Sequence, residues 1–142
     1  MKKDVLISIK GLQFFEDSSD SIEIMTCGRY YRRNNRYYLS YDETESTGYE
    51  GCRTTLCVED SRRVTVRRTG PSSSNLIVER GRRHQCSYDT ELGAIVVGIC
   101  GDNIRSTLDD RGGELDFSYS MDINTALASE NRVIVHVKEC ES

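Results

Sequence analysis

The chain has 142 residues and a net charge of −4, with 30% charged and 37% hydrophobic residues. This composition is typical of a soluble globular protein, and no stretch is long and apolar enough to span a membrane. The apolar run near the N-terminus is short and is flanked or interrupted by Asp4, Ser8 and Lys10, so no signal-peptide core is present. We therefore expect a cytoplasmic protein that does not use a membrane and whose six cysteines are reduced thiols.

The charges are distributed unevenly along the chain. Residues 29–83 hold 12 Arg against 7 Asp and Glu, a net charge of +5, whereas the segments on either side are acidic. Since strands adjacent in sequence usually pair, this distribution predicts one positive wall. Arginines that face carboxylates across a sheet also protect sheet edges and keep a protein soluble, and we favour that interpretation.

The first predicted strands lie at the N-terminus. Val5, Ile7 and Ile9 recur at every second position, and the acidic segment 16–20 separates them from a second apolar segment at residues 22–24. A period of two places alternate side chains on opposite faces of a strand. The chain therefore opens with two strands joined by an acidic loop.

A β-hairpin follows, centred on Asn34 and Asn35 between two Tyr-rich arms. Asn tolerates positive φ better than other non-Gly residues, so the pair fits a two-residue primed turn. After the turn, Tyr37, Leu39 and Tyr41 share one face of the second arm. This is the clearest structural signal in the sequence.

The same pattern of a short alternating strand and a polar turn repeats to the C-terminus. Further strands are expected at residues 54–59, 62–68, 76–78, 84–89, 92–99, 104–108, 115–121 and 133–137. Residues 123–131 are the one segment in which we expect a helical turn. The sequence thus predicts an all-β protein, an antiparallel up-and-down barrel of about 8–10 strands that forms a single domain over residues 1–142. An antiparallel sandwich is the alternative.

The ordered set of motifs resembles the YwiB-like family of small bacterial proteins, which have a calycin-like β-barrel. The resemblance rests on residues 37–43 (YYLSYDE), 68–70 (RTG), 76–81 (LIVERG) and 88–93 (YDTELG), together with the strand around Tyr119 and the closing Val-rich strand. It covers nearly the whole chain in the right order. The resemblance implies a closed barrel similar in outline to lipocalins, and it implies no reaction.

Charged and hydroxyl side chains are predicted among the inward-facing residues. Glu43 continues the face that carries Tyr41, and Arg68 continues the face that carries Val66. An unpaired charge inside a barrel is costly, so we expect Arg68 to pair with Glu43 or to stack on Tyr41. The expected interior site consists of Tyr41, Glu43, Arg68, Tyr88, Thr90 and Tyr119.

This interior site predicts a barrel that binds a small, partly apolar or anionic molecule. Arg68 would recognise a carboxylate or phosphate, and the tyrosines would line the walls. The competing interpretation is a structural plug, in which Arg68 packs on aromatic rings at the end of a filled barrel. The sequence leaves both open, because small barrels are either filled or hollow.

No metal, cofactor or catalytic group is expected. His84 and Cys86 lie two residues apart, but the gap between Cys52 and Cys57 exceeds that of a zinc knuckle and places them on opposite faces of a strand. No nucleophile elbow is present, so a reaction would require Glu43 as a general base inside the barrel. We therefore lean against an enzyme.

The alternative function lies on the outer wall. Arginines and tyrosines interleave around the first hairpin at Arg29, Tyr31, Arg32, Arg33, Arg36 and Tyr38. Aromatic rings stack on bases while arginines hold phosphates, so this wall could bind single-stranded nucleic acid or a partner protein. The net negative charge of the chain argues against nucleic acid.

Overall fold

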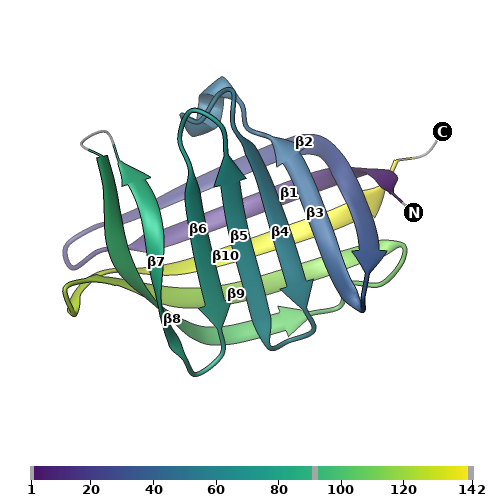
Figure 1. Ribbon diagram of the computed structural model, residues 1–142. Coiled ribbons are helices and arrows are strands. Elements are labelled where there is room, and N and C mark those ends of the chain that lie inside the picture. The colour runs from purple at the N-terminus through teal and green to yellow at the C-terminus, as the bar shows by residue number, and fades with distance from the viewer. Residues whose placement is uncertain (1, 91–92, 141–142) are drawn as a thin grey trace.

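The alternating segments of the sequence form ten antiparallel strands that close into a barrel in the computed structural model, which describes residues 2–90 and 93–140 (Figure 1). The strands are β1 (Lys3–Phe14), β2 (Ser19–Arg33), β3 (Arg36–Asp42), β4 (Arg53–Glu59), β5 (Arg63–Thr69), β6 (Ser74–Glu79), β7 (Arg83–Thr90), β8 (Gly93–Ser106), β9 (Gly112–Ile123) and β10 (Ala126–Glu139), and a short 3-10 helix, η1 (Glu45–Thr47), lies between β3 and β4. Each strand pairs with its neighbours in sequence, and β1 pairs with β10. The predicted up-and-down barrel is confirmed, and the alternative of a sandwich is wrong.

Tight turns form where the sequence supplies residues that tolerate positive φ. Asn34 and Asn35 have φ values of 54° and 62°, as the primed turn requires. Asn124 and Thr125, with φ values of 52° and 68°, form the corresponding turn between β9 and β10. The helical turn expected at residues 123–131 is therefore wrong, because strand pairing across this turn overrides the local helix propensity.

The connections between strands alternate between the two ends of the barrel. One end, which we call the filled end, carries both termini and the β2–β3, β4–β5, β6–β7 and β8–β9 connections. The other end, which we call the chamber end, carries the β1–β2, β3–β4, β5–β6, β7–β8 and β9–β10 connections. The inward-facing side chains differ between these two ends, and that difference positions the candidate site.

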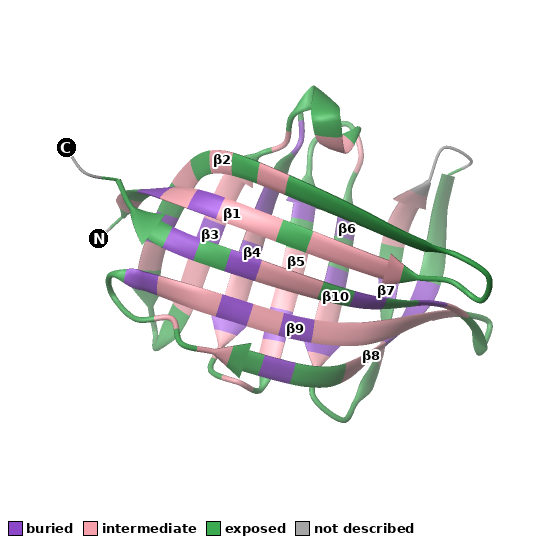
Figure 2. Cartoon of the chain, turned by 180° about the vertical axis from the view of Figure 1, so that it is seen from behind, coloured by how far each residue is buried: buried purple, intermediate pink, exposed green. Residues whose placement is uncertain are grey.

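Apolar side chains close the interior of the filled end. The inward residues there that are at most 3% exposed include Val5, Ile7, Tyr30, Val58, Val64, Val78, Ile104, Leu115 and Val137. Figure 2 shows some of these buried positions as purple bands across β1, β9 and β10. These side chains fill the interior of this half of the barrel.

Gly28 lies where β2 begins to pair with β3. β2 pairs with β1 from Ser19 to Tyr30 and with β3 from Gly28 onward. A Cβ atom at this position would lie 2.4 Å from the carbonyl oxygen of Ser40 and 2.5 Å from Cδ1 of Ile7. Only glycine therefore permits this close approach of β2 to β3 and to the core.

The seam between β6 and β7 is the weakest of the ladders that the structure describes. Its register contains two residue pairs, Ser74 with Tyr88 and Asn75 with Ser87. Beyond them, the amide of Ile77 donates to the Sγ atom of Cys86 at 3.3 Å instead of to a backbone carbonyl. The predicted pairing of residues 76–78 with 84–89 is thus only partly formed.

The interior at the chamber end is open. Three isoleucines at inward positions there remain well exposed, Ile22 at 45%, Ile95 at 37% and Ile123 at 43%. In Figure 2 the far end of β2 is correspondingly green. Inward-facing apolar side chains keep such exposure only where solvent reaches the inside of the barrel.

Candidate functional site

The candidate site is the inward-facing surface of the chamber end, which we call the chamber. Its polar side chains come from strands β3, β4, β5, β7 and β9 and from the residue that follows β3. Tyr41 lies on β3 opposite Thr54 of β4, and Thr54 in turn lies opposite Arg68 of β5. Tyr88 of β7 and Tyr119 of β9 complete the wall and pack against the core. The alternation of the sequence thus brings five residues of the predicted site, Tyr41, Glu43, Arg68, Tyr88 and Tyr119, to one end of the barrel.

Arg68 is the cation of the chamber, and it is only 9% exposed. Its guanidinium carbon lies 3.6 Å from the centre of the Tyr49 ring and 5.8 Å from that of Tyr88. Its Nε and Nη2 atoms donate to the carbonyl oxygen and the hydroxyl of Ser72 at 3.4 Å and 3.5 Å. Weak, long hydrogen bonds and ring stacking therefore hold the guanidinium group.

The prediction that Arg68 pairs with Glu43 or stacks on Tyr41 is wrong. The described residues place no carboxylate oxygen within ion-pairing distance of Arg68, and its stacking partner is Tyr49 rather than Tyr41. The connection between β3 and β4 folds over the chamber end beside the β5–β6 connection (Figure 1). Because it folds this way, the Tyr49 ring takes the place beside Arg68 that was expected for Tyr41 or Glu43.

Glu43 lies beside this cation without binding it. Its Oε1 atom is buried and has no hydrogen-bond partner among the described residues. Burial raises the pKa of the Glu43 carboxyl, while the nearby Arg68 charge and hydrogen bonding from Thr54 and Tyr41 lower it. The chamber therefore presents an uncompensated acceptor close to an uncompensated cation.

Tyrosine hydroxyls link the Arg68 wall to the opposite wall. The hydroxyls of Tyr49 and Tyr88 are 3.4 Å apart. Burial raises the pKa of Tyr119 to about 12, and the nearby Tyr88 adds to this rise. Burial and the Glu43 charge likewise raise the pKa of Tyr41. With their pKa values raised, Tyr41, Tyr88 and Tyr119 are neutral at physiological pH and act as hydrogen-bond donors or acceptors.

A pocket of about 290 Å³ lies on the opposite wall, over the inner face of β1, β2, β9 and β10. Its inward lining consists of Gly11, Gln13, Asp20, Ile22, Tyr119, Asn131 and Val133. Asn131 is buried and donates through Nδ2 to the hydroxyl of Ser129 at 3.1 Å. Tyr119 belongs both to this pocket and to the tyrosine group beside Arg68.

Sequence reasoning missed several residues of the chamber. Asn131 has the same parity as the valines of the last strand, so alternation could have found it. Ser129 has the same parity as Asn131, and the register shift of β10 lies before it, between Leu127 and Ser129. Tyr49 and Ser72 lie in connections that have no periodicity. The backbone of Thr90 ends β7, but the orientation of its side chain is outside what the structure describes.

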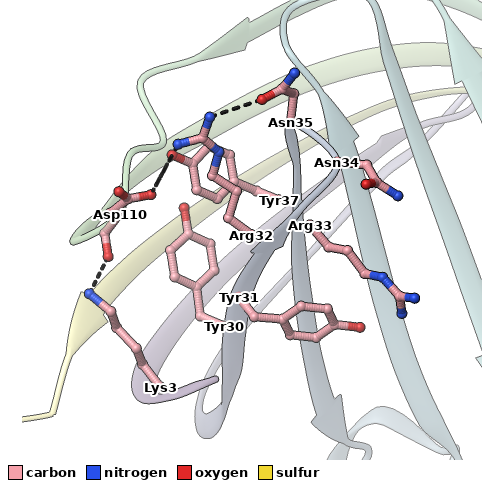
Figure 3. A pocket seen from close by; sticks show the side chains of 9 residues that line it. All are labelled: Lys3, Tyr30, Tyr31, Arg32, Arg33, Asn34, Asn35, Tyr37 and Asp110. Carbon is pink, nitrogen blue, oxygen red and sulfur yellow. Dashed lines mark hydrogen bonds and ion pairs between the residues drawn. The ribbon is translucent and has the colours of Figure 1, made fainter. Parts of the chain in front are cut away.

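The Arg and Tyr residues of the alternative site lie on the paired strands β2 and β3. On β2, Arg29, Tyr31 and Arg33 face outward, whereas Arg32 has the opposite parity. Figure 3 shows Arg32 directed toward Asp110 while Tyr31 and Arg33 point away from it. Five of the six residues therefore face outward, and Arg32 closes the filled end.

Interactions within the chain already use much of this outer wall. The ring centroids of Tyr31 and Tyr38 are 4.9 Å apart, so each ring covers one face of the other. Arg29 pairs with Asp4 at 3.7 Å, and Arg36 pairs with Glu59 at 3.3 Å. This arrangement matches the interpretation of paired surface charges more closely than that of a nucleic-acid site.

A second pocket, of about 470 Å³, lies at the filled end around Asp110. Tyr37 donates to Oδ1 of Asp110 at 3.0 Å, and Lys3 donates to its carbonyl oxygen. Arg32 lies 3.9 Å from the same carboxylate (Figure 3). These contacts hold the β8–β9 connection over the end of the barrel. The pocket is formed by the side chains that make this closure.

The described part of the chain gathers no group of three or more His, Cys, Asp or Glu side chains that could hold a metal ion. His84 instead lies 3.2 Å from Oε1 of Glu79, and Cys86 is buried in the core. In residues 2–90 and 93–140, no helix has the length and apolarity needed to cross a membrane.

Comparisons with known proteins agree on a β-barrel. Residues 7–134 match the family profile described as Domain of unknown function (DUF1934). The chain is 28% identical over 125 residues to the Uncharacterized beta-barrel protein YwiB of Bacillus subtilis (strain 168), covering 87% of this chain and 86% of that protein. The crystal structure of ywiB protein from Bacillus subtilis aligns with a TM-score of 0.85 at 22% identity, covering 99% of this chain and 94% of that chain. This structural likeness shows a shared fold.

Proposed function

Since the chain belongs to the DUF1934 family, whose description states no activity, we propose a function from the chamber itself: a calycin-like barrel that binds a small, partly apolar molecule through an anionic group. In this proposal residues 1–142 act as one domain in the cytoplasm. The six cysteines, all free thiols, support a reducing compartment.

The observation that carries the proposal is the inward-facing guanidinium of Arg68, which lacks a carboxylate partner in the described chain. A buried charge without a counterion is costly, and a bound anion would supply that counterion. Arg68 keeps free N–H donors beyond its two long bonds to Ser72. A carboxylate or phosphate group is the natural acceptor for such donors.

Exposed apolar side chains at the chamber end favour ligand binding over the interpretation of a structural plug. Ile22, Ile95 and Ile123 line the chamber end with exposed apolar surface, which a purely structural interior would have buried. The adjacent pocket of about 290 Å³ is at the lower end of the range for small-molecule sites. A short apolar tail would cover this surface while its anionic head reaches Arg68.

Octanoate is the probe that tests this proposal, because it joins an eight-carbon tail to one carboxylate. Isothermal titration should show binding to the wild type, and Arg68→Gln should weaken it about tenfold or more by removing the charged donor. Arg53→Gln is the matched control: it removes an arginine on the neighbouring strand whose side chain faces outward and pairs with Asp42 at 3.0 Å. Binding that is absent, or that depends equally on both arginines, would contradict the proposal.

Native mass spectrometry gives an independent test on protein purified from its own host. Excess mass that disappears on denaturation is expected, and its value would identify the size of the ligand. Loss of that excess in Arg68→Gln, but not in Arg53→Gln, would place the ligand in the chamber. Salt-dependent binding of a single-stranded oligonucleotide, weakened by Arg32→Ala combined with Arg33→Ala, would instead support the outer-wall alternative.

A further inference from the structure

Two opposite charges face the chamber without forming an ion pair. Glu43 follows β3 and Arg68 lies near the end of β5, and both take inward positions at the chamber end. They are close enough for the Arg68 charge to affect the Glu43 carboxyl, yet no N–O distance between them is within 4.0 Å. The space between them is therefore wider than a direct contact.

Each of these charged side chains has unused hydrogen-bonding capacity. Oε1 of Glu43 is buried and unpartnered, and an unpaired buried acceptor costs free energy. The guanidinium of Arg68 is held from one side by the Tyr49 ring and the Ser72 oxygens. A group that accepts from Arg68 and donates to Glu43 would satisfy both at once.

We propose, building on the binding function above, that the ligand is a carboxylic acid with a hydrogen-bond donor, a hydroxyl or an ammonium, on the carbon next to its carboxylate. The carboxylate accepts from Arg68, and the donor binds Oε1 of Glu43. The apolar remainder of the molecule lies along the wall that holds Ile22 and Val133.

Glu43 acts as the specificity element in this arrangement. A plain carboxylate at Arg68 places a second negative charge beside the Glu43 carboxyl and leaves Oε1 unpaired. An adjacent hydroxyl or ammonium turns that unfavourable neighbour into a hydrogen-bond partner. The chamber therefore selects against simple fatty acids and in favour of acids with a donor on the second carbon.

The neighbouring hydroxyls already have partners in the described chain. The Tyr41 and Thr54 hydroxyls already interact with the Glu43 carboxyl, and the Tyr49 hydroxyl lies 3.4 Å from that of Tyr88. A ligand donor that enters the gap therefore finds Oε1 of Glu43 as the free acceptor.

The test compares octanoate with 2-hydroxyoctanoate, two ligands that differ by one hydroxyl. Wild-type protein should bind 2-hydroxyoctanoate about tenfold more tightly, the effect of one hydrogen bond to a charged acceptor. Glu43→Leu, which removes the acceptor, should bind the two ligands equally. Arg68→Gln should weaken both in parallel.

The outcomes separate this inference from the proposed function. If octanoate binds and depends on Arg68, but the hydroxyl gives no gain in wild type, this inference is wrong and the binding function stands. If neither ligand binds, both are overturned. Should Glu43→Leu fail to fold, Glu43→Gln replaces it: a neutral acceptor must then reduce the preference for 2-hydroxyoctanoate at least threefold, and an unchanged preference would overturn the inference.

Discussion

The guanidinium carbon of Arg68 lies 3.6 Å from the centre of the Tyr49 ring, so a residue of the β3–β4 connection holds the cation that β5 places in the chamber. This contact joins a regular strand, whose register is fixed by pairing on both sides, to an irregular connection. The position of the Arg68 head group therefore depends on Tyr49 as well as on the barrel.

Tyr49→Ala is expected to lower the free energy of unfolding by about 1 to 2 kcal/mol, because it removes the ring that covers a desolvated guanidinium. Tyr49→Phe keeps the ring and loses only the long contact between the Tyr49 and Tyr88 hydroxyls, so it should stay within about 0.5 kcal/mol of the wild type. Urea unfolding followed by circular dichroism measures both. Equal losses in the two variants would show that the hydroxyl, and not the ring, makes the contact.

Glu43 should make stability depend on pH. Burial raises the pKa of its carboxyl above the ordinary 4.5, so the folded protein binds this proton more tightly than the unfolded chain does. The stability that follows is fully present below pH 4.5 and is lost as the pH rises through the folded pKa. Glu43→Gln does not ionise, so it should gain stability relative to the wild type over that window.

The measurement is the difference in urea midpoint between Glu43→Gln and the wild type at a series of pH values. This difference should increase from acid toward neutral pH and then become constant. A difference that decreases over the same range would mean that Arg68 lowers the pKa of Glu43 more than burial raises it.

Much of the barrel could be predicted from the alternation of apolar and polar residues along each strand, and the inward residues of the chamber are an example. Tyr41 and Arg68 were placed inside because each continues a run of inward apolar residues, and a strand keeps that parity as long as its pairing is regular. Parity does not give the distance between residues on different strands. For this reason the expected pairing of Arg68 with Glu43 was wrong even though both residues belong to one chamber.

The remaining errors come from places where the period of two stops. Tyr49 lies in a connection whose path depends on the whole barrel end, and no local pattern in the sequence indicates it. The segment 123–131 contains good helix formers, yet the positive φ values of Asn124 and Thr125 direct it into a turn. Ser129 continues the inward parity of the valines of β10, but it was assigned to that helical segment, so its place in the strand was missed.

Asn34 provides a test of the turn that organises the first hairpin. Its φ of 54° is unfavourable for most L-residues and free of strain for glycine. Asn34→Ala should lower the free energy of unfolding by about 1 kcal/mol, and Asn34→Gly should leave it unchanged or raise it slightly. Thermal unfolding of the two variants checks this. Equal melting temperatures would mean that the turn tolerates other backbone conformations.

The seam between β6 and β7 should open more readily than the other ladders of the described chain. The Ile77 amide donates to the Sγ atom of Cys86 at 3.3 Å, and sulfur is a weak acceptor. Burial raises the pKa of the Cys86 thiol, so the acceptor is the neutral thiol and not the stronger thiolate. We therefore expect the Ile77 amide to exchange with deuterium faster than amides in the fully paired strand β4.

Cys86→Ala and Cys86→Ser separate the hydrogen bond from the packing at this seam. Alanine removes the acceptor, so exchange at Ile77 should accelerate about tenfold, whereas serine supplies an oxygen acceptor of similar size and should slow exchange relative to alanine. Amides of β4 report global opening and should change equally in both variants. If Ile77 in the wild type exchanges as slowly as β4, the sulfur contact holds the seam as firmly as a backbone ladder, and ligand entry is confined to the chamber end.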